Sequence, residues 1–291
     1  MNKNIIIVFS FLASGIVSAG EEVDLREPAS PQGMVRIINV RGDVDIVGWE
    51  KDEIAIRGEL DDLAEKLVFR VEENFIQIEV KLPKRNIRWG DGSDLEINVP
   101  RGSRVDFEGV STDLSIVDIQ GGLRVKSVSG DVIADRIHDQ IIINTVSGEL
   151  RVKTSEGSLR ASTVSGNLDI ESHTGDVDLE SVSGEIELSS DKSDRLRAQN
   201  VSGEIDVEMN LMEGASVELG SVSGDVELEI NGYVDAQFDL DAGMGGEIYN
   251  EISDDESSSS FPGGEKLRMT VGNGSARISI RTVSGDIRLE K

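Results

Sequence analysis

The tripeptide Val-Ser-Gly occurs seven times in this chain, and its spacing limits the possible folds more than any other feature. Successive copies start 18, 18, 18, 19, 21 and 61 residues apart, at Val128, Val146, Val164, Val182, Val201, Val222 and Val283. A near-constant period of this length is typical of repeat proteins, in which one unit cannot bury its apolar face alone but stacked units can. The spacing therefore predicts a stack of similar units.

A second apolar motif lies between these copies and follows the same series of spacings. Its six pairs are Leu123/Val125, Ile141/Ile143, Leu159/Ala161, Val177/Leu179, Leu196/Ala198 and Val217/Leu219. Because both motifs keep the same spacing, each unit of 18 residues or slightly more holds two strands. The extra residues of the longer units fall near Ser189 and near Met209, where a turn can bulge without breaking a strand.

Within each unit the apolar residues alternate with polar ones. Val182, Ile186 and Leu188 share parity, so we expect all three to face the core, with Glu185 and Glu187 facing solvent. A period of two is typical of strands rather than helices. The repeat glycines are expected to meet a positive φ or a close approach of stacked coils; they are Gly130, Gly148, Gly166, Gly184, Gly203, Gly224 and Gly285.

These patterns predict an all-β fold, a narrow β-solenoid with two strands in each coil and about 4.8 Å between neighbouring coils. The alternative is an antiparallel up-and-down meander of nine-residue units. Identical residues recur at every second strand, and this favours the stack over the meander. Both ends of a solenoid expose strand edges, so we expect a β-rich cap at each end.

The chain divides accordingly into four segments. They are a signal peptide at 1–19, an N-terminal cap at 20–110, the solenoid at 111–232 and a C-terminal cap at 233–291, which contains an acidic, Ser-rich loop at 253–264. The short stretch from Asp61 to Lys66 is the only candidate for a helical turn.

The N-terminus has the pattern of an export signal. A short basic start is followed by an apolar run from Ile5 to Val17 and by small residues at Val17-Ser18-Ala19. The run is too short for a bilayer core, which needs about 20 residues, and no second apolar run of similar length follows. We expect an exported chain without a transmembrane anchor after cleavage, located in the periplasm or at the cell surface, or secreted.

Composition excludes several classes of function. There are 56 acidic and 29 basic residues, and the resulting charge of -27 opposes nucleic-acid binding, which requires neutralisation of phosphates. The absence of cysteine excludes disulfides and Cys-ligated metals. The two histidines, His138 and His173, are expected in exposed turns. The repeat serines have no histidine nearby in sequence to act as a base. We expect no enzyme activity and no cofactor.

An acidic residue follows most of the repeat glycines and would form a ladder on the outside of the stack. These weak candidates for loose divalent-cation binding are Asp131, Glu149, Glu185, Glu204 and Asp225, whereas Asn167 occupies the same position without a charge. A specific calcium site needs six to eight oxygen ligands around one point. One acid per coil predicts loose accumulation of cations rather than a specific site.

The functional prediction is a non-catalytic envelope protein with a structural or adhesin-like binding role. Its partner is expected in the envelope or at the surface; the acidity favours a cationic one, and the sequence does not identify it. Two alternatives stay open: a calcium-stabilised surface adhesin and a polysaccharide-active β-helix enzyme. The second would need paired carboxylates in a cleft, and a chain with 4% aromatic residues offers few platforms for sugar rings.

Three segments resemble a known family. They are Leu95-Glu96-Ile97-Asn98-Val99-Pro100-Arg101-Gly102, the repeated Val-Ser-Gly-Asp/Glu, and the closing Thr282-Val283-Ser284-Gly285-Asp286-Ile287. Together with Gly48-Trp49 near the start, they resemble the bacterial "putative adhesin" β-strand-repeat family, a domain of unknown function. The resemblance covers nearly the whole chain after the signal peptide. It implies an envelope-exposed β-solenoid and carries over no catalytic residue.

Overall fold

The computed structural model describes residues 5–8, 22–83, 91–261 and 263–291, and these residues form strands and turns without a helix. The chain divides into two compact units, Met1–Thr145 and Val146–Lys291. We call them the N-terminal and C-terminal units. The predicted signal peptide at 1–19 lies outside the described residues, apart from the short strand β1 (Ile5–Val8).

The N-terminal unit combines antiparallel and parallel pairs of strands. Strand β3 runs parallel to β6, β7 and β8, and β8 runs parallel to β9 and β10. Antiparallel pairs β2–β4, β4–β7 and β5–β6 complete the unit. The bounds after β1 are β2 Glu22–Pro28, β3 Met34–Trp49, β4 Glu53–Glu59, β5 Lys66–Val71, β6 Phe75–Lys81, β7 Ser93–Pro100, β8 Arg104–Ile119, β9 Leu123–Lys126 and β10 Val132–Asn144.

The predicted helical turn from Asp61 to Lys66 is wrong. This stretch is a tight turn between β4 and β5, closed by a 2.7 Å hydrogen bond from the Ala64 amide to the Asp61 carbonyl. A single hydrogen-bonded turn has too few bonds to offset the ordering of its backbone. Asp61 is instead held by its side chain, which faces Arg41.

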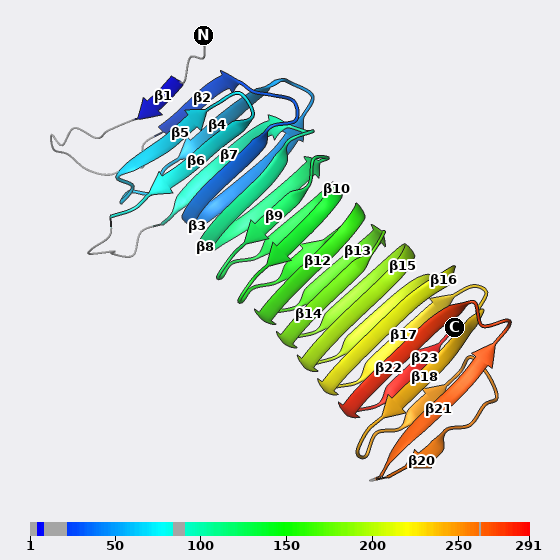
Figure 1. Ribbon diagram of the computed structural model, residues 1–291. Coiled ribbons are helices and arrows are strands. Elements are labelled where there is room, and N and C mark those ends of the chain that lie inside the picture. Colours follow the sequence, from blue (N-terminus) through cyan, green and yellow to red (C-terminus); the bar gives the residue numbers. More distant parts are fainter. Residues whose placement is uncertain (1–4, 9–21, 84–90, 262) are drawn as a thin grey trace. The chain divides into compact units, whose positions relative to one another are not determined.

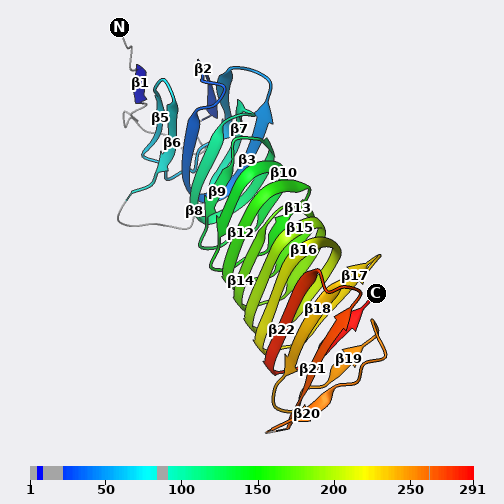
Figure 2. The ribbon, with the colours of Figure 1, turned by 45° about the vertical axis from the view of Figure 1, so that its right-hand side comes forward.

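The C-terminal unit is a stack of parallel strands, shown from two sides in Figures 1 and 2. One row runs β12–β14–β15–β16–β22, and a second row runs β11–β13–β15–β16–β17–β23, because β15 and β16 each pass through both rows. The bounds are β11 Leu150–Val152, β12 Ser155–Ser165, β13 Leu168–Thr174, β14 Val177–Ser183, β15 Ile186–Ser202, β16 Ile205–Ser223, β17 Val226–Asn231, β18 Ala236–Ala242, β19 Ile248–Asn250, β20 Ser258–Ser260, β21 Gly264–Val271, β22 Ala276–Ser284 and β23 Ile287–Glu290.

The registers of this stack confirm the predicted β-solenoid. Leu168 lies opposite Ile186, which lies opposite Ile205 in the next coil. All three side chains are buried. An antiparallel meander is excluded here, because corresponding residues pair in parallel strands. Register shifts in β15–β16 lie between Ser190 and Arg195, near the positions where the longer spacings predict extra residues.

The 61-residue gap before the last repeat reflects an insertion rather than a break in the stack. Strand β22 pairs directly with β16, and β23 pairs with β17, so the last repeat follows the sixth in space. The intervening chain forms β18 and β19, which pair in parallel with β22 and β23, and the antiparallel strands β20 and β21. The chain therefore passes beyond the position of the last coil and returns to fill it.

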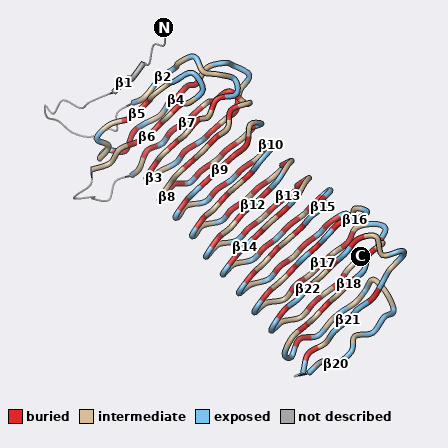
Figure 3. The backbone as a smooth tube through the Cα atoms, in the orientation of Figure 1, coloured by how far each residue is buried: buried red, intermediate tan, exposed pale blue. Residues whose placement is uncertain are grey.

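The predicted inward position of the repeat valines is wrong. Ser181 is 5% exposed whereas Val182 is 47% exposed, so the serine faces the core and the valine faces solvent. The corner at Gly184 resets the alternation, and Ile186 and Leu188 are buried again beyond it. Figure 3 shows the resulting alternation of buried and exposed positions along each strand.

Candidate binding surfaces

The first candidate surface is a line of exposed valines at one corner of the C-terminal unit. The repeats stack these side chains in adjacent coils, and each is between 45% and 54% exposed. We call this line the valine ridge, and it consists of Val146, Val164, Val182, Val201, Val222 and Val283. The N-terminal unit carries exposed valines at the same repeat position, Val110 and Val128.

The repeat glycines allow the coils to approach at this corner. A Cβ atom on Gly184 would lie 2.1 Å from the carbonyl oxygen of Gly166, and one on Gly203 would lie 2.2 Å from the carbonyl oxygen of Gly184. Those distances are far below a normal contact, so the position accepts no side chain without movement of the backbone. In the N-terminal unit Gly130 has the same restriction against Thr112.

The residues that follow the glycines stack as predicted, and some of them have a structural role that the sequence did not reveal. Asn167 Oδ1 accepts a 3.1 Å hydrogen bond from the Glu185 amide of the next coil. Asp225 Oδ1 accepts one of 2.8 Å from the Asp286 amide. The short Asp or Asn side chain thus links coils at this position, which explains why a neutral Asn serves there. Among the described residues, no group of acidic or histidine side chains is arranged to hold a metal ion.

A broad acidic surface extends beyond this ladder. Glu187, Asp206 and Glu227 are direct neighbours on adjacent parallel strands. The next outward row brings Glu208, Glu229 and Glu290 into register. We call the whole surface the acidic face, and it consists of Glu185, Glu187, Glu204, Asp206, Glu208, Asp225, Glu227, Glu229 and Glu290.

Most of the acidic face lacks compensating cations. Arg288 lies 3.4 Å from Asp225, and Asn231 donates a 2.7 Å hydrogen bond to Glu208. The other seven carboxylates form neither an ion pair nor a side-chain hydrogen bond with the residues that the structure describes. Burial raises the pKa of Asp206, and repulsion from Glu187, Glu204 and other neighbours raises it further. The pKa of Glu227 is raised first by burial and then by repulsion from Glu290 and Asp206, although Arg288 on the neighbouring strand opposes the shift.

Replacement of Asp206 by Asn is expected to stabilise the protein by about 0.5–1 kcal/mol at neutral pH, because like charges opposite each other in a sheet are unfavourable. A carboxyl group with a raised pKa destabilises the fold above that pKa and ceases to do so as pH falls through it. The gain should therefore shrink in acid. Urea unfolding at pH 7 and pH 4 measures the gain in unfolding free energy at each pH. The variant Asp191→Asn, at an exposed position, is the control, and its unfolding free energy should differ little from that of the native chain.

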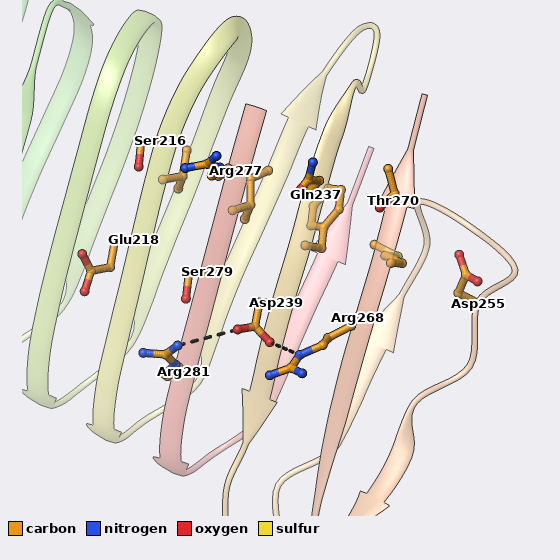
Figure 4. Close-up of a pocket in the computed structure, with 14 residues that line it drawn as sticks. Ser216, Glu218, Gln237, Asp239, Asp255, Arg268, Thr270, Arg277, Ser279 and Arg281 are labelled. Carbon is orange, nitrogen blue, oxygen red and sulfur yellow. Dashed lines mark hydrogen bonds and ion pairs between the residues drawn. The ribbon is translucent and has the colours of Figure 1, made fainter. Parts of the chain in front are cut away.

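A second candidate surface is a groove of about 860 Å³ on the opposite row of strands, over β16, β22, β18 and β21 (Figure 4). Arg268 lies 2.8 Å and Arg281 lies 3.7 Å from the carboxylate of Asp239. The hydrogen bond from Arg268 lowers the pKa of Asp239. Arg277 lies on the same surface and forms no ion pair with the described residues. Phe238 is buried in the groove floor. Cations and anions nearly balance in this groove, so it does not favour a ligand of either charge.

His173 lies inside the C-terminal unit, and its predicted place in an exposed turn is wrong. The side chain is fully buried. Its Nδ1 atom lies 2.8 Å from the Ser155 hydroxyl, and Nε2 has no hydrogen-bond partner among the described residues. Burial is the main cause that lowers the pKa of His173. His138 is exposed, as predicted, but it lies in strand β10 rather than in a turn.

The lowered pKa of His173 predicts a loss of stability in mild acid. Below its ordinary value of 6.5 the unfolded chain binds the proton and the folded chain does not, so stability falls with pH by up to about 1.4 kcal/mol per unit. The fall ends once pH passes below the folded pKa. The variant His173→Asn should lack this fall in unfolding free energy when urea unfolding is measured between pH 7 and pH 5. His138→Asn should retain it; an equal effect of both variants would contradict the assignment.

Stacked parallel coils that carry ladders of identical residues define a β-solenoid. One of its two rows of strands carries the acidic face, and the other carries the groove in which charges nearly balance. The chain belongs to the Toastrack DUF4097 family, whose model matches residues 35–290. No functionally curated protein matches the chain. In the part of the chain that the structure describes, no helix has the length and apolar character needed to cross a membrane.

Two solved structures share low sequence identity with the chain. A "putative cell adhesion protein" from Clostridium sporogenes is 8% identical, with a TM-score of 0.23, and the match covers 93% of this chain and 99% of that one. A "putative adhesin" from Bacteroides fragilis is 13% identical, with a TM-score of 0.39, and the match covers 94% of this chain and 100% of that one.

Proposed function

We propose that this Toastrack protein is exported and acts without catalysis in the cell envelope, where it binds a macromolecular partner. The observation that carries the proposal is the regular outer surface of the C-terminal unit, on which the repeats place the same residue types in successive coils. A periodic surface of this kind offers many weak, equivalent contacts. Such contacts suit an extended partner better than a small substrate.

Export is tested by the N-terminus of the purified mature protein. Cleavage after Ala19 should leave a chain that begins at Gly20, and cleavage one residue later a chain that begins at Glu21. Intact-mass measurement of material from the envelope fraction distinguishes this product from a chain that retains Met1. Retention of Met1 in all exported material would contradict the proposal.

Binding is tested by crosslinking in cells, followed by capture of the mature protein from envelope fractions. A defined partner should be retained by the native chain and retained less by Gly184→Ala, which destabilises the C-terminal unit. Turnover of envelope glycans by the purified chain would instead support the polysaccharide-active enzyme. That activity should then depend on a specific pair of carboxylates.

Magnesium and calcium are expected to raise the melting temperature alike, by about 2–4 °C, because both accumulate loosely near the acidic face. The rise should be weak and should not saturate, and it should exceed that from sodium chloride at equal ionic strength. Thermal unfolding in the three salts measures the difference. Saturation by micromolar calcium, without an effect of magnesium, would favour the calcium-stabilised adhesin instead.

A further inference from the structure

The valine ridge is an apolar surface without a partner in the described structure. Its six side chains are about half exposed, although the positions inside the same corner hold polar residues such as Thr163, Ser181 and Ser221, which are at most 5% exposed. Exchanging the two residue types would bury the apolar groups and expose the hydroxyls, which is the usual preference. An exposed apolar line on a protein surface is typical of an interaction site.

The acidic face adjoins the ridge at its last four valines, Val182, Val201, Val222 and Val283. Only a serine and a glycine separate Val182 from Glu185 in the chain, and the same separation recurs at Val201 and Glu204. On the other side of the ridge the next outward residues are Glu180, Gln199, Gly220 and Arg281, which carry no net charge. A partner on the ridge therefore meets a strong negative charge on one side only.

This charge distribution identifies the chemistry of the partner. A second copy of the chain would bring a further net charge of -27 to the surface, which opposes self-association. A segment with apolar side chains on one stripe and Lys or Arg along one side complements both features. Its cations would gain most from the carboxylates that lack partners, among them Glu187, Asp206 and Glu229.

The spacing of the ridge favours a helix over an extended strand. Neighbouring valines are separated by one strand spacing of about 4.8 Å, so five steps from Val146 to Val283 span about 24 Å. The turns of an α-helix rise by about 5.4 Å, close to that spacing, and about 16 helical residues cover the same length. Alternate side chains of an extended strand are about 6.8 Å apart and lose register with the valines within two coils.

We propose that the valine ridge and the acidic face together bind a cationic amphipathic helix of a partner protein. The apolar stripe of the helix lies along the valines, and its basic side chains reach the carboxylates beside them. This inference rests on the proposed role in partner binding. It can fail separately, because a partner captured in the envelope could contact another surface.

The test uses a fluorescein-labelled synthetic peptide of about 16 residues, with leucines at helical spacing and lysines at the remaining positions. Fluorescence anisotropy at physiological salt measures its binding to the full chain. The critical variant replaces Val164, Val182, Val201 and Val222 by Thr, which preserves charge and β-branching. We expect at least about tenfold weaker binding of the peptide. Circular dichroism and thermal unfolding verify that this variant is folded.

Matched variants separate the two features of the surface. Glu187→Gln with Asp206→Asn should also weaken binding about tenfold. Asp191→Asn with Asp194→Asn makes the same charge change at the opposite corner and should alter binding less than about twofold. A peptide of the same composition in scrambled order should bind more weakly and should not respond to the Val→Thr changes.

Two results would overturn the proposal. Equal binding of the native chain and the Val→Thr variant would mean that charge alone attracts the peptide. Sedimentation equilibrium of the chain without peptide provides the other measurement. A dimer that depends on concentration and disappears in the Val→Thr variant would assign the ridge to a second copy of the chain.

Discussion

Replacement of Gly184 by Ala is expected to destabilise the C-terminal unit by about 2–6 kcal/mol. Two causes add. The φ angle of Gly184 is +144°, a conformation that strains any other residue. The new Cβ would also lie 2.1 Å from the Gly166 carbonyl oxygen, so the two coils would have to separate. Because that oxygen belongs to the backbone, a side-chain rotation cannot relieve the clash.

Gly214→Ala is the matched control. Gly214 also has a positive φ, +79°, but a Cβ atom added there would meet nothing within 4 Å. Its replacement should cost only the backbone strain, about 1–2 kcal/mol. Urea unfolding of both variants measures the loss of unfolding free energy in each. The difference between the two losses is the cost of the clash between neighbouring coils. Equal losses would show that the close approach at the repeat glycine does not stabilise the stack.

The sequence period predicts the registers of the C-terminal unit because a parallel stack places corresponding residues side by side. The offset of 18 from Leu168 to Ile186 and of 19 from Ile186 to Ile205 equals the spacing of the Val-Ser-Gly copies. The last offset could not be predicted from the period. The spacing of 61 shows that residues are inserted between β17 and β22, but only the pairing of β22 with β16 shows that the last two copies are neighbours in the stack.

The direction of the valines could not be predicted, because the rule of alternation assumes a continuous strand. A corner at the glycine changes the direction of the chain, and the parity of Ile186 then says nothing about Val182. Asn200 shows why the inward neighbour is polar. Its side chain donates a 2.7 Å hydrogen bond to the Gly184 carbonyl, and Thr282 donates one of 3.2 Å to Gly224. Asn200 and Thr282 thus bind corner carbonyl groups that the ladder of strands leaves available, whereas the hydroxyls of Thr163, Ser181 and Ser221 have no hydrogen-bond partner among the described residues.

The candidate surface was only partly visible in the sequence. The ladder after the glycines was predicted because it belongs to the repeat, and Glu185 and Glu204 do contribute to the acidic face. Asp206 and Glu227 were not singled out, because acidic residues are so frequent that no pattern separates the crowded ones. The raised pKa of Asp206 depends on its acidic neighbours, and no arginine pairs with it among the described residues. In contrast, Asp169 lies 2.6 Å from Arg151 and is neutralised.

Replacement of Asp61 by Ala is expected to destabilise the N-terminal unit by about 3–5 kcal/mol, because it removes one partner of a buried ion pair. Arg41 contacts the Asp61 carboxylate with two nitrogen atoms, one of them Nη2 at 3.0 Å from Oδ1. The side chains of Arg41 and Asp61 are 16% and 1% exposed. Without Asp61 the guanidinium would lose both of these hydrogen bonds. The Leu63 amide would also lose its 2.8 Å hydrogen bond to Oδ1.

The double variant Arg41→Met with Asp61→Leu should recover most of this loss, since apolar residues of similar volume can replace a buried ion pair at little cost. The hydrogen bond from Arg41 lowers the pKa of Asp61 below its usual 3.8. The contribution of Asp61 to stability is therefore complete above that value and disappears as pH falls through the lowered pKa. Urea unfolding at pH 7 and pH 2 should show the stability difference between the native chain and the Asp61→Ala variant shrinking in acid. A single variant as stable as the double variant would mean that solvent reaches Arg41 once Asp61 is gone, and that burial of the pair contributes little.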